Sequence, residues 1–578
     1  MRGSHHIGAV RLAWLVTLCY LLLAESGLAA TPDPDAVRQE MERREQERVD
    51  ERRQTLERAP SELKARAPSA QLGELPAESP CFVIKTVKLT GKYAERFASI
   101  TARLGKLPGT CVGVRGLAMI ASTLDQALVE RGYVTSRVSL PAQNLRDGAL
   151  EIVLHPGLVG AILIEEAPQA STWGTWRNAM PVKVGEPLNI RDIEQGLEQM
   201  KRLASQRVVT RIEPGAAPDT STLVIERQQG DLLGRLHGGA SMDNSGSKAL
   251  GRGNAAVNVV LDNPAGWNDL LNVSINSNVT QPTHEHRSQS ATLFYSIPYD
   301  YQLFSLFAST SRFGQFVQGT TTRFLSSGSS QSIEGKWGYT AWRTASTKTG
   351  ASLSLSSRRS RSYLDDVELM VQRRRVTNVE AALNHKQLFG NATLDLELAY
   401  RRGVGWFDAQ EDLPLATAGG VTVRPRITTL SAEYSLPFQW LATDYRYGSR
   451  LRLQTTPDTT LSIDQIAIGS RGTVRGFDGD TVLQAERGFY WRNELSGGTA
   501  WGQVLGMQWL PYAALDMGAV SGPSADVLTG RRLAGAALGL RAAYKAFNAD
   551  LALAFPLLQP ANFPRTGGNV YLSVSYSF

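Results

Sequence analysis

The sequence predicts a β fold: a transmembrane barrel of sixteen antiparallel strands, preceded by two small α+β domains and an N-terminal helix. Three observations support this fold class. The chain opens with an export signal, the region 231–578 consists of short alternating segments, and the last segment ends on an aromatic residue. After the signal, no segment has the ~18 consecutive apolar residues of a transmembrane helix, so a membrane crossing would have to use strands.

The N-terminus has the three parts of a secretory signal. Arg2 and Arg11 precede an apolar run over 12–24, and small residues follow through Ala29 and Ala30. This order is typical of a cleaved signal peptide, and the run is too short to span a bilayer comfortably. We therefore expect residues 1–30 to be removed by cleavage after Ala29 or Ala30.

Removal of the signal leaves two cysteines, Cys81 and Cys111. An exported chain with two cysteines most simply pairs them in a disulfide. Closing a loop of this length would stabilise the domain by roughly 3–4 kcal/mol in the chain-entropy model. Two buried free thiols are the alternative.

The mature N-terminus combines a charged helix with a linker. Residues 33–58 alternate acidic residues with arginine and have only a thin apolar stripe, so we expect a helix over 31–58 that lies in water or in a polar cavity. Residues 59–80 are rich in proline and small residues and predict a linker. Such a helix could fill a pore, or it could be a solvated tether.

Two similar modules follow the linker. Residues 81–156 predict a strand, a helix and two further strands, and residues 157–230 repeat this pattern in outline. Each module is large enough for one small core. A repeated module is typically used for binding in series.

The region 231–578 predicts the barrel. Counting back from the C-terminus, Phe578, Tyr576 and Val574 lie on one face of the last strand, and Ser577 and Ser575 lie on the other. Sixteen strands would take about 21 residues each, including connections, which suits spanning strands of ~10 residues. A barrel of this size has a water-filled lumen, so we expect a plug.

One loop and one strand of this region combine charges with small residues. Gly469–Asp480 has the turn-forming residues that a re-entrant loop requires, which predicts such a loop at about 465–485. Alternation over 505–518 places Asp516 and Gly518 on the face opposite an apolar series. Asp516 should therefore point into the lumen, where an arginine would need a carboxylate partner.

Specific motifs give the chain a family resemblance. The stretch Arg131–Arg137, followed by Gln143, Leu145, Gly148 and Leu150, resembles the first periplasmic POTRA domain of two-partner secretion transporters. These are the outer-membrane exporters of the hemolysin-activator and filamentous-hemagglutinin-transporter type (the TpsB family). Cys81 and Cys111 also suit that domain, and the second module resembles a second POTRA domain more loosely.

The re-entrant loop carries a further part of the resemblance. Val474, Arg475, Gly476 and Phe477 resemble the VRGY/F motif on the long loop of this family and of the wider barrel-assembly superfamily. Asp516-Met517-Gly518 matches the family's inner-wall Asp-x-Gly element, although Ala514 stands where an aromatic is usual. The resemblance implies sixteen strands and an N-terminal helix inside the barrel.

These residues lead to a hypothesis about the loop. We expect Arg475 to pair with Asp516 and to fix the loop across the pore, the alternative being an exposed loop arginine. A water-exposed pair would contribute only ~0–1 kcal/mol, so its value would lie in positioning. We also expect Arg358, Arg359 and Arg361 to line the lumen or an outer loop, or else to be a solvated strand end.

The resemblance also implies a function and partners. The partner would be a large secreted protein of the adhesin, hemolysin or contact-dependent toxin class. We expect it to be encoded next to this gene. The chain would bind it unfolded in the periplasm and export it without ATP. Outer-membrane lipid and, during biogenesis, the barrel-assembly machinery are the other expected partners. The alternative function is an insertase of the barrel-assembly type.

The remaining function classes have little support in the sequence. The net charge of +7 over 578 residues is modest, and the basic residues are scattered, which argues against a nucleic-acid partner. His284 and His286 are typical of a polar loop rather than a metal site. We find no catalytic triad, no persuasive carboxylate pair and no ligand cluster, so we expect no enzyme activity, cofactor or metal.

Overall fold

A computed structural model covers the chain. It describes residues 43, 62–63, 72–105, 107–168, 170–280, 282–318, 322–414, 416, 419–497, 503–504, 506–564 and 567–578. The expected signal peptide lies outside the described residues. So do the expected N-terminal helix and the linker, apart from Arg43, the pair Glu62 and Leu63, and residues 72–80.

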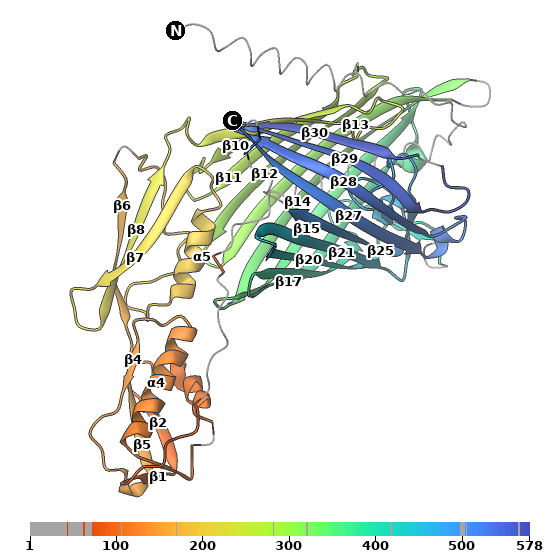
Figure 1. The fold of residues 1–578 in the computed structure, drawn as a ribbon. Helices are drawn as coiled ribbons and strands as arrows, with labels where there is room; N and C mark the ends of the chain where they lie inside the picture. Colours follow the sequence, from red (N-terminus) through yellow and green to blue (C-terminus); the bar gives the residue numbers. More distant parts are fainter. Residues whose placement is uncertain are drawn as a thin grey trace.

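The C-terminal region is a closed barrel in which every wall strand pairs antiparallel with its neighbours (Figure 1). The sixteen wall strands are β9 (Leu236–Asp243), β10 (Asn254–Asp262), β11 (Leu270–Asn278), β12 (Arg287–Tyr299), β13 (Gln302–Gln318), β14 (Arg323–Arg343), β15 (Thr347–Leu364), β17 (Arg374–Phe389), β18 (Ala392–Val404), β20 (Arg426–Trp440), β21 (Thr443–Thr455), β25 (Arg487–Gly497), β27 (Met507–Ser521), β28 (Arg532–Tyr544), β29 (Phe547–Leu558) and β30 (Asn569–Ser577). Two short pieces, β16 (Val367–Glu368) and β26 (Gln503–Val504), extend the sheet. The predicted fold class is confirmed.

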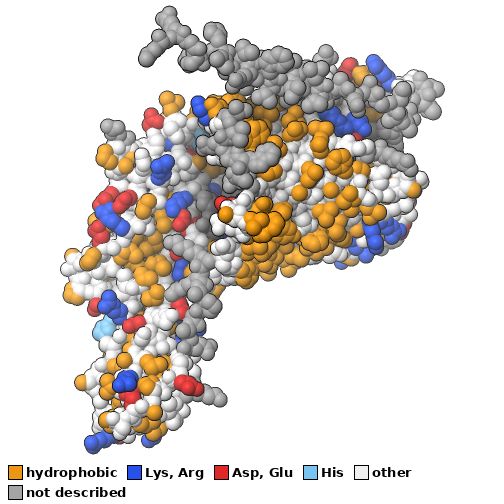
Figure 2. Space-filling view, viewed as in Figure 1, with side chains coloured by type: hydrophobic (Ala, Val, Ile, Leu, Met, Phe, Trp, Pro, Cys, Tyr) orange, Lys and Arg blue, Asp and Glu red, His pale blue; other side chains and the backbone are white. Residues whose placement is uncertain are grey.

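Alternation sorts the side chains of each strand between lipid and lumen. On β13, Phe304 and Leu306 are exposed on the outer wall, whereas Phe307 points to the opposite side of the strand and is buried. The outer wall is therefore covered with apolar side chains, as the space-filling view shows (Figure 2). Several strands are longer than the expected ~10 residues, because hairpins such as β13–β14 continue past the apolar band.

The last strand closes the barrel against the first. Strand β30 pairs with β9 from Ser573↔Asp243 to Ser577↔Gly239, and Phe578 exchanges two backbone hydrogen bonds with Gly238 at 2.9 and 3.0 Å. Tyr576 and Phe578 are partly exposed on the outer wall, and the Tyr576 ring lies 4.8 Å from the Phe547 ring of β29. The aromatic end of the chain therefore lies at the seam.

The first of the two N-terminal domains is a small α+β unit. Its elements are β1 (Phe82–Ile84), β2 (Thr86–Thr90), α3 (Ala94–Phe97), the 3-10 helix η1 (Ala98–Leu104), β3 (Thr110–Val112), α4 (Val114–Glu130), β4 (Arg137–Ser139), η2 (Leu145–Asp147) and β5 (Ala149–His155). The apolar face of α4 packs on a sheet of order β2-β5-β4.

The structure corrects one strand of this domain. We expected a single strand after Cys81, but the segment divides at Lys85, because β1 pairs with β3 while β2 pairs with β5. The amides of Lys85 and Thr86 both donate to the Gly148 carbonyl at this bend, at 2.7 and 3.1 Å. A disulfide joins Cys81 to Cys111 beside the β1–β3 pair, with the two Cα atoms 5.4 Å apart.

The second domain has the same plan and touches the barrel (Figure 1). It contains β6 (Leu158–Glu166), α5 (Ile190–Met200), β7 (Gln206–Pro214) and β8 (Thr220–Gln229), with the sheet order β6-β8-β7. Strands β6 and β8 are parallel, and β7 is antiparallel to β8. Across the described parts of the chain, no helix is long and apolar enough to cross a membrane.

Candidate functional site: a loop anchored inside the barrel

The connection between β21 and β25 folds back into the barrel. It contains the hairpin β23 (Ile466–Ile468) and β24 (Leu483–Ala485), which brackets the motif at 474–477. Val474 and Phe477 are almost fully buried, in a cluster with residues of the barrel wall and the neighbouring loops. Its members are Ile466, Ile468, Val474, Phe477, Leu483, Ala485, Val520, Ala525, Leu533 and Phe563. The loop therefore has its own core, shared with the wall.

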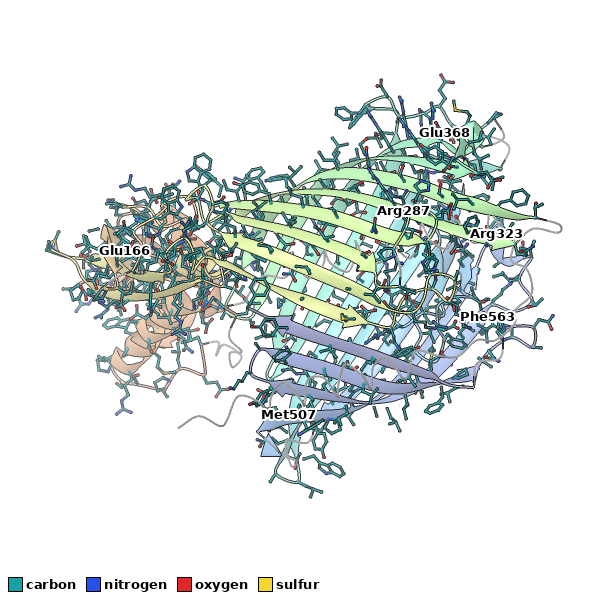
Figure 3. The ribbon with its side chains drawn as sticks, turned by 90° about the horizontal axis from the view of Figure 1, so that it is seen from above. Glu166, Arg287, Arg323, Glu368, Met507 and Phe563 are labelled. Carbon is teal, nitrogen blue, oxygen red and sulfur yellow. A yellow bond between two sulfur atoms is a disulfide. The ribbon has the colours of Figure 1, made fainter. Side chains whose placement is uncertain are left out.

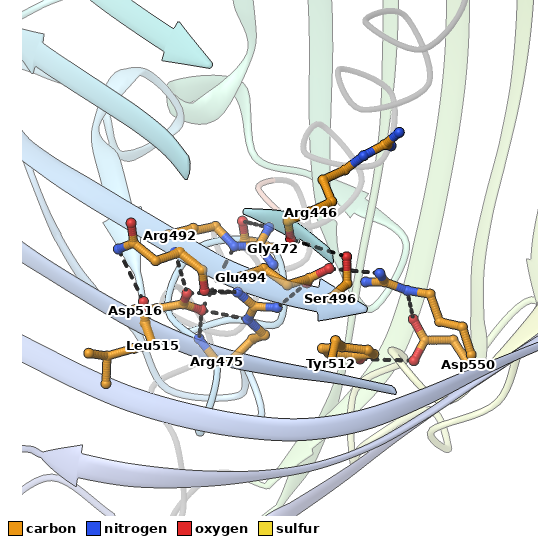
Figure 4. A network of polar contacts seen from close by, with 12 residues as sticks. Arg446, Gly472, Arg475, Arg492, Glu494, Ser496, Tyr512, Leu515, Asp516 and Asp550 are labelled. Carbon is orange, nitrogen blue, oxygen red and sulfur yellow. Dashed lines mark hydrogen bonds and ion pairs between the residues drawn. The ribbon is translucent and has the colours of Figure 1, made fainter. Parts of the chain in front are cut away.

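Arg475 binds the predicted inner-wall carboxylate (Figure 4). Its Nε and Nη2 donate to the two Asp516 oxygens at 2.7 and 2.8 Å, and its backbone amide donates to the same carboxylate at 3.0 Å. Asp516, on β27, is only 1% exposed. This bidentate geometry fixes the plane of the guanidinium as well as its position.

A second carboxylate, which sequence reasoning missed, completes the site. Glu494 of β25 accepts from Arg475 Nη1 at 2.8 Å and from Arg541 Nη1 at 2.7 Å. Arg541 of β28 continues the network to Asp550 of β29 (Figure 4). The same alternation that located Asp516 could have located Glu494, since Trp491 and Leu495 face outward on that strand.

The loop lies close to the wall where small residues allow it. Gly476 has a φ of +109°, and a Cβ there would lie 2.6 Å from the Phe555 carbonyl oxygen. A Cβ on Gly535 of β28 would lie 1.7 Å from the Arg475 carbonyl oxygen, and one on Gly518 would lie 3.0 Å from Ile468 Cγ2. Glycine at these positions is therefore needed for the close approach.

A tyrosine from the last strand binds the motif backbone. The Tyr571 hydroxyl accepts from the Gly476 amide at 3.1 Å and donates to the Phe477 carbonyl at 2.7 Å. Ala514, which replaces the aromatic expected before Asp516, belongs to the same buried cluster as Tyr571. The small residue leaves room beside the ring, and the loop is thereby linked to the closing strand.

The tip of the loop is tied to the first surface hairpin. Asp478 binds Lys248 Nζ at 2.9 Å and Arg252 Nη2 at 3.1 Å, and Asp480 binds Arg252 Nη2 at 3.0 Å. Both cations belong to the β9–β10 connection. The loop is thus held from β9–β10, from β25 and β27, and from β30.

A second buried network docks the second domain on the barrel. Glu198 of α5 binds Arg343 at the end of β14 at 2.8 Å and Lys348 of β15 at 2.7 Å. Burial alone would raise the pKa of Glu198, but the Arg343 hydrogen bond and the nearby Lys348 charge prevail and lower that pKa to about 2. The backbone amide of Glu62 also donates to Glu198, at 2.8 Å. One carboxylate thus joins the linker, the domain and the barrel.

Further contacts extend this interface to two more turns of the barrel. Asn178 Nδ2 donates to the carbonyls of Trp267 and Pro298 at 2.6 and 2.8 Å. Tyr301, in the β12–β13 turn, donates to Asp192 of α5, whose pKa is raised by burial. The second domain is therefore held at the β10–β11, β12–β13 and β14–β15 turns. These turns lie at the end of the barrel where most connections between strands are short.

A polar cavity lies beside the loop arginine. It has a volume of about 300 Å³, and its lining includes Arg450, Arg475, Arg492 and Glu494. Arg492 also donates to the Gly472 carbonyl at 2.9 Å, which holds the start of the motif. Charged side chains therefore reach into the space between loop and wall.

The structure brings together only part of the predicted site set. Val474, Arg475, Gly476, Phe477, Asp516 and Gly518 form one site. The Cys81–Cys111 disulfide lies in the first domain, and Tyr576 and Phe578 lie at the seam. These last four residues take no direct part in the loop site.

Comparisons with known proteins agree with this geometry. The model of the family described as "Haemolysin secretion/activation protein ShlB/FhaC/HecB" matches residues 219–542, and two POTRA-domain models match residues 82–157 and 158–214. A chain described as "Outer membrane transporter CdiB-2" from Burkholderia pseudomallei is 34% identical over 99% of this chain and 100% of its own length.

Other relatives and a solved structure give the same answer. The "Hemolysin transporter protein HpmB" of Proteus mirabilis is 28% identical over 71% of this chain and 72% of its own length. The structure of CdiB from Escherichia coli superposes with a TM-score of 0.79 at 26% identity, over 95% of this chain and 100% of that one. The resemblance inferred from the motifs is confirmed. The chain belongs to the ShlB/FhaC/HecB family of two-partner secretion transporters, whose barrels lie in the bacterial outer membrane and whose POTRA domains lie in the periplasm.

Proposed function

We propose that this transporter receives an unfolded secreted partner at its POTRA domains and exports it through the barrel lumen. The observation that carries the proposal is the loop held inside the lumen by Arg475 and Asp516, on a barrel to which a periplasmic domain is docked. A passive pore would need neither part. The relatives named above are described as transporters, and one of them is named for hemolysin.

The energy for export would come from the partner rather than from a nucleotide. The outer membrane offers no ATP, and the sequence has no phosphate-binding loop of the P-loop type. Folding of the exported chain outside the cell would pull the remainder through. The partner would pass in an extended form, because a folded domain would not share the lumen with the loop.

Recognition would use the edges of the second POTRA sheet. Strands β6 and β7 are the two edges, and both carry exposed apolar residues, with Leu163 at 50% and Val209 at 60% exposure. Addition of a strand at such an edge binds an extended peptide through main-chain hydrogen bonds, with little demand on sequence. This mode suits a large partner of the adhesin, hemolysin or contact-dependent toxin class.

The charged N-terminal helix would act as a plug that leaves during export. Arg43 is helical and only 6% exposed, which supports an enclosed position for this residue. Glu62, in the linker, binds Lys201 at 2.7 Å besides its bond to Glu198. The linker is thereby held at the interface between POTRA domain and barrel, where a partner would enter.

The test is export of the large secreted protein encoded next to this gene, in a host with and without this chain. We expect the protein to reach the medium only when the chain is present. Equal export in both hosts, with other outer-membrane barrels failing to assemble without the chain, would favour the insertase. Equal export with normal assembly of other barrels would contradict both functions.

A further inference from the structure

A group of arginines lies on the outer wall of the barrel, at the end away from the POTRA domains. Arg312 of β13, Arg359 and Arg361 of β15, and Arg375 of β17 alternate in register with outward apolar residues. We call these four residues the arginine patch. The sequence led us to expect Arg359 and Arg361 in the lumen or on an outer loop, or else at a solvated strand end. They face the outside of the wall near the end of β15, which agrees with the second alternative, whereas Arg358 has the inward parity of Ser354 and Ser360.

The outward direction follows from the strand register. On β15, Leu353 is 48% exposed on the outer wall, and Arg359 and Arg361 follow it at even spacings. On β13, Arg312 shares the parity of Phe304 and Leu306, which face outward. The patch therefore continues the lipid-facing side of these strands.

Measured from the short turns at the POTRA end of the barrel, the patch lies at the far edge of the apolar band. Its members lie about 10 to 14 residues from the short turns, and at ~3.3 Å per residue with a strand tilt of ~40° this gives about 25–35 Å along the membrane normal. The apolar band of such barrels is ~25 Å tall. In the space-filling view, Lys and Arg gather at the end of the barrel away from the POTRA domains (Figure 2). The arginines therefore lie at the level of the outer-leaflet headgroups.

The patch concentrates charge that the described protein does not neutralise. Arg359 and Arg375 lie directly opposite each other across the β15–β17 ladder, an arrangement that is destabilising for like charges. Among the described residues, no carboxylate forms an ion pair with any member of the patch, and the one carboxylate that acts on Arg361 through space, Glu368, is already bound by Arg373. Two arginines at the same end differ in this respect, since Arg373 is bound by Glu368 and Arg426 by Asp458.

Two further arginines lie at the flank of the patch but do not belong to it. Arg323 of β14 stacks 4.1 Å from the centre of the outward Phe316 ring, and Arg287 of β12 lies near Arg312 in register. Both are labelled in Figure 3, at the end of the barrel opposite Glu166 of the second POTRA domain. We leave both out of the patch, because Arg323 is already stacked on Phe316 and Arg287 interacts electrostatically with Asp366.

We propose that the arginine patch binds the phosphate groups of a phosphorylated glycolipid in the outer leaflet. Guanidinium groups bind phosphate oxygens in bidentate pairs, and the outward Leu353, Leu355 and Ile333 beneath the patch provide a surface for the acyl chains. Lipid phosphates would supply the missing counter-charge between Arg359 and Arg375. This site depends on the location of the barrel in the outer membrane and not on the proposed export mechanism.

The test measures binding of diphosphorylated lipid A to the full chain purified in detergent, by native mass spectrometry. We expect the variant Arg359→Gln/Arg361→Gln/Arg375→Gln to bind the lipid at least about tenfold more weakly than the unchanged protein. The matched control is Arg532→Gln, because Arg532 is a single outward arginine at the same end of β28. This control should bind as the unchanged protein does.

A second measurement uses the unchanged protein and does not depend on the folding of a variant. Lipid A without phosphates should bind at least about tenfold more weakly than the diphosphorylated form, since the phosphates supply the charge-assisted bonds. Equal binding of the two lipids would overturn the proposal, as would equal binding by the triple variant. A triple variant that retains the lipid but loses export would assign the patch to the exported protein instead.

Discussion

Two buried ion networks hold this transporter together, and they are built in opposite ways. In the lumen, a cation on a loop, Arg475, binds two carboxylates of the wall, Asp516 and Glu494. At the periplasmic end, a carboxylate on a helix, Glu198, binds two cations of the wall, Arg343 and Lys348. The wall of the barrel thus carries charged side chains at both levels, and each network holds a different part of the chain against it.

The two networks also differ in how firmly the backbone is held. The loop motif has hydrogen bonds to its amides and carbonyls from Asp516 and Tyr571, and it lies against Gly535 without room for a Cβ. The docked helix is joined to the wall mainly through side chains. We infer that the loop is the more firmly fixed part and that the domain interface is the one that yields first.

The largest effect is expected from loss of the loop arginine. Arg475→Ala removes the bidentate partner of buried Asp516 and leaves it one longer cation contact, to Arg492 at 3.8 Å; breaking a buried pair in this way costs about 3–5 kcal/mol in comparable cases. We expect export of the partner protein to fall at least about a hundredfold while the barrel remains inserted in the outer membrane, as measured by secretion assay and by heat-modifiable mobility of the barrel. The control is Arg471→Ala, a neighbour on the same loop that binds the Leu572 carbonyl and contacts the Tyr571 ring. If Arg471→Ala abolishes export and Arg475→Ala does not, the comparison between the networks is wrong.

A methyl group on the wall should displace the loop without removing any charge. A Cβ at Gly535 would lie 1.7 Å from the Arg475 carbonyl oxygen, so Gly535→Ala should move the motif and reduce export at least about tenfold. Gly335 of β14 is the matched control, because a Cβ there meets no atom within 4 Å. Secretion by Gly335→Ala should equal that of the unchanged protein. Normal export by Gly535→Ala would show that the loop position is not critical.

A smaller effect is expected at the docked domain. Glu198→Gln removes the charge that binds Arg343 and Lys348, so the second POTRA domain should dock more weakly and export should fall partially. The distance between a spin label on this domain and one on the barrel should broaden in distribution. Glu186→Gln is the control, because its pair with Arg96 is about half exposed and contributes ~0–1 kcal/mol. An unchanged distance distribution in Glu198→Gln would contradict this account of the interface.

The smallest effect is a dependence of docking on pH. The pKa of Glu198 is lowered from 4.5 to about 2 when the domain is docked, so its contribution is complete above about pH 4.5 and is lost as the pH falls toward 2. Asp192 acts in the opposite direction, because burial raises its pKa. The spin-label distances should therefore broaden between pH 4.5 and 2 in the unchanged protein and change less in Glu198→Gln. Equal pH dependence in the two proteins would exclude Glu198 as the titrating group.

Local pattern was sufficient for the barrel and for half of the loop site. Alternation of apolar and polar residues predicted the strands and placed Asp516 in the lumen, because a strand has a period of two wherever one face meets lipid. The same rule would have found Glu494. The lumen or outer-loop position expected for Arg359 and Arg361 is wrong, and the alternative, a solvated strand end, agrees better, because both residues have the outward parity of Leu353 near the outer end of β15.

The docking network could not be predicted from local pattern. Glu198 lies on a helix about 145 residues from Arg343, and only the folded arrangement brings the helix onto the turns of the barrel. The split of the first strand at Lys85 was also missed, because it depends on two different pairing partners, β3 and β5. Tyr571 was missed for the same reason, since its contacts to Gly476 and Phe477 join segments that are distant in sequence.

The central claim is that Arg475 and Asp516 act as one unit in fixing the loop for export. A double-mutant cycle on secretion of the partner protein tests it most directly, with Arg475→Ala, Asp516→Ala and the combined variant. We predict that the two single variants and the double variant lose export to a similar degree, because each removes the same interaction. Losses that multiply in the double variant would show that the two residues act separately and would contradict the claim.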